Sequence, residues 1–274
     1  MNKKTIPLNI KNYLNEYQLV ETLTGRLGDE ILKYQDKHQR ILYLKSGEGV
    51  AAESLEQEAN ALTWLSNQGI NIPKVINFNH QNDRAFLLIT NVEGLPSHKV
   101  KNIDKEAILK IVAEALLKLN RIKIKEADKL NTLDNDLEEI KQYISMKVIE
   151  TEKFLTNNEG RGPEEIYNYL LATKKLFDND SFTHGDYCLP NILISEKGFG
   201  LIDFGDCGMG DKYKDFSSTE VSIKRNFGAE WINVFYKYYD PKIIVNQKKI
   251  KYYQLIDQFD YCLNIEMYNR LINR

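Results

Sequence analysis

Cysteine and histidine are scarce in this sequence of 274 residues, which has only three cysteines and four histidines. The odd number of cysteines and their unpaired spacing argue against a disulfide framework, and no His or Cys spacing is typical of a zinc site. Cys188 and Cys207 are better explained as small packing residues than as reactive thiols, since buried cysteines are the commoner case. Thiol or zinc chemistry is therefore not indicated.

Long apolar runs and an excess of charge of one sign are also missing. No run approaches the roughly 20 apolar residues that cross a bilayer, and Met1 to Lys4 do not lead into the apolar core of a signal peptide. The net charge of -2 provides no basic footprint for nucleic acid. We therefore expect a cytoplasmic protein whose partners include neither a membrane nor a nucleic acid.

The apolar content of 42% is enough, at this length, to bury a large core in one split domain or two lobes. After a lead-in helix within residues 1–16, strand-like segments occupy residues 17–23, 29–35, 40–46, 75–79 and 85–90. Helical periodicity predicts helices at residues 51–68, 104–121, 133–155, 163–177, 213–225, 228–239 and 246–270. Strands first and helices after them predict an α+β architecture with a cleft.

Two motifs rich in Asp and Gly lie close together in the second half of the chain. Asp186 and Asn191 are five residues apart, the spacing of the base and a magnesium ligand in a kinase catalytic loop, and Asp203 opens an Asp-Phe-Gly triplet. A carboxylate near an attacking hydroxyl can orient it and accept its proton, while an amide oxygen and a second carboxylate can hold metal ions. We predict a phosphoryl-transfer site with Asp186 as the catalytic residue and Asn191 and Asp203 as metal ligands.

Between the two motifs, residues 192–194 and 199–202 form short apolar runs that we interpret as a tight hairpin. This hairpin would bring Asn191 and Asp203 together across a strand pair. Either motif alone is also compatible with an ordinary turn, and only their combination in this order favours chemistry. His184, which starts the first motif, is either a metal ligand or a structural residue bonded to the backbone, and the second reading is favoured.

Lys45 is predicted to end the third strand, on the same face as Tyr43. In the helix that follows, Glu58 falls within the apolar stripe of Leu55 and Leu62 rather than on the polar face. A carboxylate turned inward needs a partner, because an unpaired buried charge costs several kcal/mol. Lys45 is the natural partner, although a glutamate at the helix edge could also reach water.

The stretch HGDYCLPNIL followed by GLIDFGDCGMGDKYKD resembles the aminoglycoside 3'-phosphotransferases, which are small bilobal kinases of the protein-kinase-like fold. The resemblance covers nearly the whole chain and is sharp from His184 to Asp215. It implies an N-terminal lobe, residues 1–92, with a five-stranded antiparallel sheet and one main helix, and a larger, mainly helical catalytic and substrate-binding lobe, residues 93–274. The implied activity is transfer of a γ-phosphate from ATP or GTP, with Mg²⁺, to an antibiotic hydroxyl, favouring the 3'-hydroxyl and conferring resistance. The oligomeric state stays open.

The same resemblance implies nucleotide contacts elsewhere in the first lobe. The Thr90 carbonyl and the Val92 amide would meet the adenine edge, and Tyr43 would stack on its face, unless Tyr43 is only a core aromatic. Gly25 and Gly28 lie where these kinases keep a phosphate-covering loop, although a plain hairpin explains them equally well. Lys45, held by Glu58, would contact the α- and β-phosphates.

The acceptor side departs from the family pattern. The implied substrate contacts are Glu159 in the loop 157–162 and the acids Asp257 and Asp260. Arg225 and Asn226 occupy the positions of an acidic pair, and Asp206 replaces an arginine. The chain also continues beyond Phe259, so that Asp260 could replace a terminal carboxylate, or the segment from Tyr261 could close over a less cationic substrate.

Two alternatives remain. One is a kinase of the same fold that acts on a macrolide, a neutral sugar or a metabolite, since substrate does not follow from fold. The other is a nucleotide-binding protein without catalysis, against which the complete set of Lys45, Glu58, Asp186, Asn191 and Asp203 argues. A protein kinase is disfavoured because only eleven residues separate Asp203 from Asp215, too few for a peptide-docking activation segment.

Overall fold

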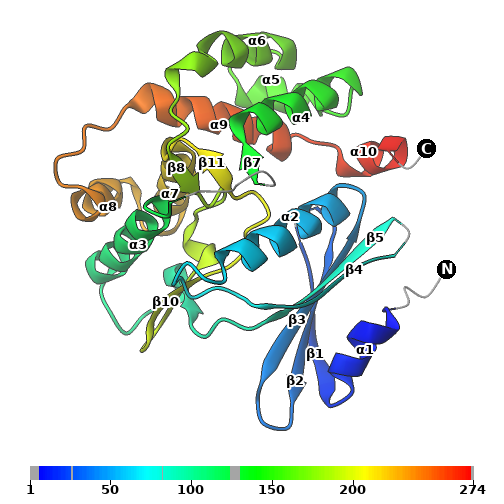
Figure 1. Ribbon diagram of the computed structural model, residues 1–274. Coiled ribbons are helices and arrows are strands. Elements are labelled where there is room, and N and C mark those ends of the chain that lie inside the picture. Colours follow the sequence, from blue (N-terminus) through cyan, green and yellow to red (C-terminus); the bar gives the residue numbers. More distant parts are fainter. Residues whose placement is uncertain (1–5, 26, 82, 124–129, 273–274) are drawn as a thin grey trace.

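The computed structural model describes residues 6–25, 27–81, 83–123 and 130–272, and these form a sheet lobe and a larger helical lobe (Figure 1). The sheet has the order β1-β2-β3-β5-β4, and every pairing in it is antiparallel. Its strands are β1 (Tyr17–Thr24), β2 (Glu30–Asp36), β3 (Ile41–Glu48), β4 (Val75–Gln81) and β5 (Arg84–Thr90). The predicted α+β fold with a five-stranded antiparallel sheet is confirmed. β3 continues three residues beyond Lys45, to Glu48, so Lys45 does not end the strand.

The two faces of the sheet pack against different helices. In β3, Leu42 and Leu44 are buried in a cluster with Ile10 of α1 (Leu8–Leu14), whereas the other face carries Tyr43 and Lys45. This opposite face lies against α2 (Val50–Leu65), which packs on β3 and β5. The alternation along β3 therefore directs Lys45 toward α2, as the period of two predicts.

A short segment after β5 joins the lobes. β6 (Leu95–Pro96) pairs with β9 (Ile192–Ser195), which forms a hairpin with β10 (Gly198–Leu201). Gly94 has φ +137, and a Cβ there would lie 2.9 Å from the backbone oxygen of Ile194. Only glycine allows this close approach, which fixes the connection between the lobes against the hairpin that separates the two motifs.

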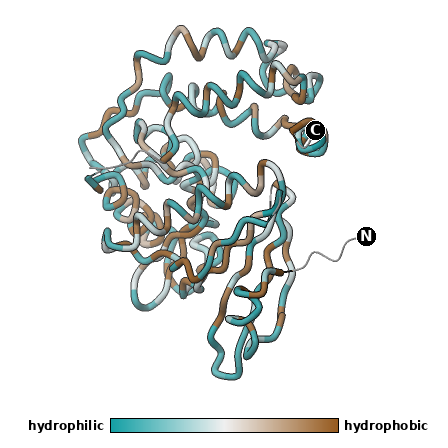
Figure 2. The backbone as a smooth tube through the Cα atoms, turned by 45° about the vertical axis from the view of Figure 1, so that its right-hand side comes forward, coloured by the Kyte–Doolittle hydropathy of each residue, from teal (hydrophilic) through white to brown (hydrophobic). Residues whose placement is uncertain are grey.

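The helical lobe surrounds a small sheet of β7 (Asn131–Thr132), β11 (Gly208–Gly210) and β8 (Ser181–Thr183). Its helices are α3 (Lys105–Asn120), α4 (Leu133–Ser145), α5 (Thr151–Asn157), α6 (Pro163–Thr173), α7 (Tyr213–Asn226), α8 (Ile232–Tyr239), α9 (Gln247–Tyr261) and α10 (Ile265–Ile272). Asp104 caps α3 as predicted, with its carboxylate accepting from the Ala107 amide at 2.7 Å. Hydrophobic positions alternate with polar ones along the strands and helices of both lobes (Figure 2).

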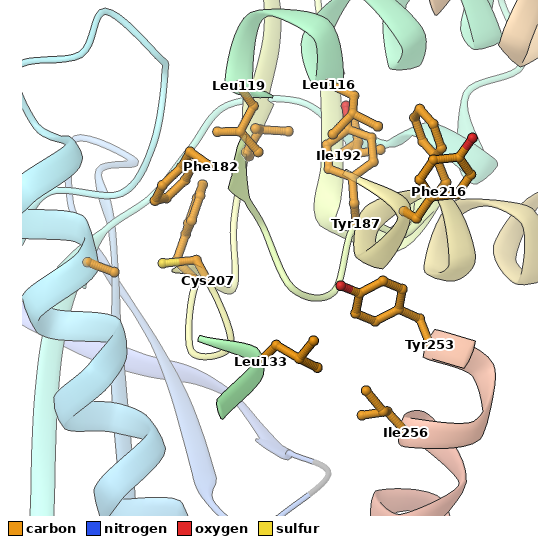
Figure 3. Close-up of a cluster of buried hydrophobic side chains, with 14 of the residues drawn as sticks. Leu116, Leu119, Leu133, Phe182, Tyr187, Ile192, Cys207, Phe216, Tyr253 and Ile256 are labelled. Carbon is orange, nitrogen blue, oxygen red and sulfur yellow. The ribbon is translucent and has the colours of Figure 1, made fainter. Parts of the chain in front are cut away.

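The core of the helical lobe joins elements from the whole second half of the chain. Leu116 and Leu119 of α3, Tyr187, Ile192 and Phe216 gather beside the loop that precedes β9 (Figure 3). The Tyr187 hydroxyl donates to the Val112 carbonyl at 2.8 Å. This packing anchors the first motif to the helical scaffold.

Two predicted long helices are each divided in two. The segment 133–155 splits into α4 and α5 because Lys147 has φ +55, which no α-helix accommodates, and the segment 246–270 splits into α9 and α10 at Cys262 to Asn264. Both breaks are held together by an antiparallel bridge between Ile149 and Leu263. The helix predicted at 228–239 begins as a 3₁₀ turn, Ala229–Trp231, before α8, and the helix predicted at 163–177 ends with a 3₁₀ turn, Lys174–Leu176.

None of the helices within the described ranges combines the length and the apolar composition that crossing a bilayer requires. Residues 1–5 of the predicted lead-in helix lie outside the described ranges, and α1 covers its remaining helical part.

Candidate active site

The first motif forms a loop between β8 and β9 in which Asp186 and Asn191 are bonded to each other. The Asn191 side-chain nitrogen donates to Asp186 Oδ2 at 3.0 Å and to the Asp186 carbonyl at 3.1 Å. Asn191 is buried, whereas Asp186 is half-buried and lines a cleft. These bonds orient the Asn191 amide, so that its oxygen points away from Asp186 and can serve as a ligand.

Buried hydrogen bonds to Asp215 and His184 hold this loop in place. Asp215 of α7 accepts from the backbone amides of His184 and Gly185, both at 3.0 Å. The His184 Nε2 lies 3.0 Å from the Ile202 carbonyl, and the side chain is fully buried. The prediction that His184 is a structural residue bonded to the backbone is confirmed.

The second motif lies directly beside the first. The Ile202 amide donates to the Asn191 carbonyl at 3.1 Å, immediately before Asp203, and the predicted hairpin of β9 and β10 brings the two segments together. Asp203 has φ +71, an uncommon conformation for a residue other than glycine. Non-glycine residues in this conformation concentrate at functional sites, where surrounding contacts hold them in place.

Lys45 connects the sheet lobe to the second motif. Its ammonium lies 2.7 Å from Glu58 Oε2 and 2.9 Å from Asp203 Oδ1. Burial by itself lowers the pKa of Lys45, but the carboxylates of Glu58 and Asp203 outweigh it and raise that pKa above its ordinary value. The predicted pairing of Lys45 with the inward-facing Glu58 is confirmed, and the lysine stays charged.

The remaining predicted nucleotide residues lie around the same sheet. Tyr43 is half-buried on the Lys45 face, and the Thr90 amide pairs with the Lys74 carbonyl at 3.0 Å. Val92 is buried, and its Cγ1 would lie 2.3 Å from a Cβ at Gly200, so the segment between the lobes packs closely on β10. Adenine contacts for these residues stay a prediction.

The loop between β1 and β2 forms a tight turn beside the cleft. The Gly25 amide donates to the Asp29 carbonyl at 2.8 Å, and the Gly28 amide donates to the Gly25 carbonyl at 3.1 Å. Gly28 has φ +81, and a Cβ on Gly25 would lie 2.1 Å from Asp29 Oδ1. Gly28 is therefore favoured by the backbone conformation of the turn, whereas a side chain at Gly25 would only displace the Asp29 carboxylate. The phosphate contacts of both glycines stay a prediction.

The cleft between the lobes measures about 1850 Å³. Its lining is acidic, with twelve acidic and six basic side chains among the described residues. The acidic ones are Asp29, Glu53, Glu58, Asp136, Glu138, Glu139, Asp186, Asp203, Asp206, Glu220, Asp257 and Asp260. Such a surface attracts cations, particularly where the cleft walls limit screening by water.

Asp257 and Asp260 of α9 line the cleft as predicted for substrate contacts, although their role stays a prediction. Desolvation and the neighbouring Asp260 raise the pKa of Asp257 to about 8, with a further contribution from Asp186. Because the Asp257 side chain is exposed to the cleft, water offsets part of the desolvation, and repulsion by the neighbouring carboxylates is the cause of the raised pKa that remains. Glu159 lies on an exposed turn with φ +57, and the cleft lining contains Asn157 and Asn158 but not Glu159 among the described residues.

Arg225 and Asn226, which the family resemblance implies stand in place of an acidic pair, also line the cleft. Cys188 lines it too, but burial raises the pKa of its thiol above the ordinary value, which does not favour a reactive thiolate.

Several lining residues were not predicted from the sequence. Lys214 of α7 pairs with Asp136 of α4 at 3.0 Å, and Tyr143 donates to Glu139 beside them. Asp134 and Asp136 mark the first turn of a helix, where acids are common for reasons unrelated to a site. The sequence therefore offered no pattern that separates Asp136 from an ordinary helix-start residue.

The oxygen donors of the two motifs fit a magnesium ion. Asn191 presents an amide oxygen and Asp203 a carboxylate, the hard ligands that Mg²⁺ takes together with substrate phosphates and water. Within the described ranges, no group of three or more His, Cys, Asp or Glu side chains has the arrangement of a metal site. A magnesium ion here would therefore depend on nucleotide phosphates for its other ligands, as is usual in kinase sites.

A loop carboxylate bonded to an asparagine, a second carboxylate in the next turn, and a strand lysine held by a helix glutamate define a phosphotransferase site of the protein-kinase-like type. The sequence matches the phosphotransferase enzyme family over residues 28–246. It is 26% identical over 255 residues to an aminoglycoside 3'-phosphotransferase of Niallia circulans, covering 92% of this chain and 97% of that protein. The chain belongs to the phosphotransferase enzyme family.

Solved structures agree on the fold. The crystal structure of an aminoglycoside 3'-phosphotransferase of type VIII aligns with a TM-score of 0.80 and 21% identity, covering 92% of this chain and 96% of that one. A Streptomyces rimosus aminoglycoside phosphotransferase in complex with ADP and streptomycin aligns with a TM-score of 0.70 and 21% identity, covering 86% and 94% of the two chains. The predicted protein-kinase-like fold and family are confirmed.

Proposed function

We propose that this protein transfers the γ-phosphate of ATP to a hydroxyl of an aminoglycoside antibiotic, with the 3'-hydroxyl favoured, and thereby confers resistance. One observation carries the proposal: Asp186, which is bonded to Asn191, and the Lys45–Glu58–Asp203 chain line the same acid-rich cleft. The similarity to aminoglycoside 3'-phosphotransferases over nearly the full length of both chains supports the substrate class.

In the proposed mechanism, Asp186 orients the acceptor hydroxyl and accepts its proton as the hydroxyl oxygen bonds to the γ-phosphorus. The bond between the γ-phosphorus and the β–γ bridging oxygen breaks in the same step, and ADP leaves. Lys45, fixed by Glu58, holds the α- and β-phosphates of the nucleotide. Asn191 and Asp203 would hold magnesium, and the chemistry that the ion would supply is neutralisation of the phosphate charge. Thr90, Val92 and Tyr43 surround the adenine, and the β1–β2 turn with Gly25 and Gly28 covers the phosphates.

On the acceptor side, Asp257 and Asp260 supply negative charge to the amino groups of the substrate, together with Asp136 and Glu139. Glu159 does not line the cleft among the described residues, and it contacts the acceptor when its turn moves toward the cleft. The side chain of the preceding Asn158 donates to the Phe154 carbonyl of α5 at 2.8 Å, and Asn157 and Asn158 both line the cleft, which supports a turn close to the acceptor. The balance of charge favours a cationic acceptor over a macrolide, a neutral sugar or a metabolite.

We also propose that the division between residues 1–92 and 93–274 separates the nucleotide lobe from the catalytic lobe, with Gly94 at the connection. A cytoplasmic location is part of the same proposal, since nucleotide triphosphates are abundant there. The choice of ATP over GTP rests on the proposed contacts of Thr90, Val92 and Tyr43 with the base.

The experiment compares paired aminoglycosides that differ only in the 3'-hydroxyl. The 3'-hydroxy member is expected to gain one phosphate, detected by mass spectrometry, and the 3'-deoxy member is expected to bind without being modified at that carbon. The reason is positional, since Asp186 assists only the oxygen held in line with the γ-phosphate. Phosphorylation of both members, or of neither alongside a good neutral acceptor, would contradict the proposed substrate.

A further inference from the structure

The helix that carries Glu58 has no cap of its own at its first turn. α2 starts at Val50, and the preceding residue, Gly49, has φ +57 and no side chain to accept a hydrogen bond. The first N–H groups of a helix have no acceptor inside the helix, so another group must satisfy them. Glu58 lies about two turns further along.

Asn269 of α10 supplies an acceptor from 219 residues further along the chain. The Val50 amide donates to Asn269 Oδ1 at 3.4 Å, and Figure 1 shows α10 beside this end of α2. A Cβ at Gly49 would lie 2.5 Å from Asn269 Oδ1 and 3.0 Å from Ile272 Cδ1. Glycine therefore provides both the backbone conformation and the space that Asn269 needs.

A neighbouring face of α10 is fixed to the helical lobe. Tyr268 is 4% exposed, and its ring packs edge-on against Tyr143 of α4 with 5.3 Å between centroids. Just before α10, the Asn264 amide donates to the Val148 carbonyl at 2.8 Å. α10 is thus anchored in one lobe while Asn269 reaches the other.

α10 also borders the acceptor side of the cleft. Tyr268 and Ile265 line the cleft, and Tyr143, on which Tyr268 packs, donates to Glu139. We call the acids of this side of the cleft, Asp136, Glu139, Asp257 and Asp260, the acidic wall. α10 therefore contacts both the start of α2, through Asn269, and the helix that carries Glu139, through Tyr268.

We propose that α10 is an interlobe brace in which Asn269 is a positioning residue: it caps α2 and thereby keeps Glu58 aligned with Lys45. The inference rests on the proposed role of that pair in holding the nucleotide phosphates. Without the cap, the first turn of α2 opens more often, and the pair spends less time aligned for transfer.

The test uses the full-length protein with Asn269→Leu, which is similar in size and has no acceptor, and Asn269→Asp, which keeps an acceptor and favours a helix N-terminus. Met267→Ala is the control, since Met267 is an exposed residue of the same helix. Amide hydrogen exchange at Val50 to Glu53 is measured without nucleotide, followed by turnover. Asn269→Ala replaces Asn269→Leu if the latter does not fold.

In Asn269→Leu, the amides in the first turn of α2 are expected to exchange about fivefold faster than in the wild type, the rate ratio that corresponds to the loss of a typical helix cap. Turnover is expected to fall by a similar factor, with an unchanged KM for the acceptor. Asn269→Asp and Met267→Ala are expected to match the wild type in both measurements. Unchanged exchange in Asn269→Leu, failure of Asn269→Asp to restore it, or faster exchange with full turnover would overturn the proposal. If no acceptor is phosphorylated by the wild type, the proposed function fails, whereas the exchange data still decide whether Asn269 caps α2.

Discussion

The ammonium of Lys45 lies 2.7 Å from one carboxylate oxygen of Glu58 and 2.8 Å from the other. Glu58 is 2% exposed, and the bonds join the third strand of the sheet to the helix that packs across it. An ion pair this deeply buried persists only because both charges are well bonded. The third bond of Lys45, to Asp203, extends the pair to the helical lobe.

Replacing Glu58 should therefore impair transfer more than nucleotide binding. Glu58→Ala is expected to lower kcat by on the order of 10- to 100-fold, because Lys45 loses the partner that aligns it with the phosphates. Glu56→Ala is the control, since Glu56 is exposed on the same helix. Steady-state kinetics with both variants check this, and a Glu58→Ala enzyme with wild-type kcat would show that the pair has no role in positioning.

Removing the Asp203 carboxylate should weaken nucleotide binding specifically when magnesium is present. Asp203 is proposed to hold the metal, so Asp203→Ala is expected to lose the gain in ATP affinity that magnesium gives the wild type. Calorimetric titrations with ATP, with and without magnesium, test this. Equal affinity under both conditions in the wild type as well as in Asp203→Ala would refute the metal roles of Asn191 and Asp203.

Reversing the charge of Arg225 should strengthen the binding of a cationic acceptor. Arg225 lines the acid-rich cleft, and Arg225→Glu is expected to tighten aminoglycoside binding by about 1 kcal/mol. Arg121→Glu, which changes the charge of an exposed residue by the same amount, controls for the effect of the altered net charge on binding. Calorimetry that gives the same affinity for both variants would place Arg225 away from the acceptor.

The raised pKa of Asp257 predicts a dependence of stability on pH. Its ordinary pKa of 3.8 is raised to about 8, so between these values the folded protein holds a proton that the unfolded chain releases. The free energy of unfolding therefore decreases as the pH rises from about 4 to 8. Asp257→Asn removes this loss and is expected to be more stable than the wild type at pH 9 but not at pH 4. Because the side chain is exposed to the cleft, screening limits the effect to about 1 kcal/mol or less.

Urea unfolding at the two pH values measures this difference. Glu196→Gln, in the exposed turn between β9 and β10, is the control for loss of one surface carboxylate. The same difference between wild type and Asp257→Asn at both pH values would contradict the raised pKa.

The sequence predicted the fold and the Lys45–Glu58 pair because local patterns determine both. Alternation along residues 40–46 assigns Lys45 to a face, and the helical period places Glu58 among Leu55 and Leu62. The helix breaks were missed because the apolar period continues through them. At the first, the left-handed Lys147 has no sequence pattern of its own, whereas Asn264, which accepts from the Met267 amide at 2.9 Å, is a recognisable cap for α10.

The acidic wall was only partly predictable. Asp257 and Asp260 were found through the family resemblance, but Asp136 and Glu139 come from a helix whose place beside α9 depends on tertiary packing. Contacts between residues far apart in sequence, such as Asn269 with Val50, leave no local pattern that could be recognised.

The most direct test of the account is the turnover of Asp186→Asn. The substitution keeps the size of the side chain and removes the carboxylate proposed to accept the hydroxyl proton, and turnover is expected to fall by about 100-fold or more. ATP affinity and the unfolding midpoint are expected to stay near the wild-type values, because Asp186 is not assigned a phosphate contact. A variant that folds, binds ATP and retains most of its turnover with an aminoglycoside would contradict the assignment of Asp186 as the catalytic base.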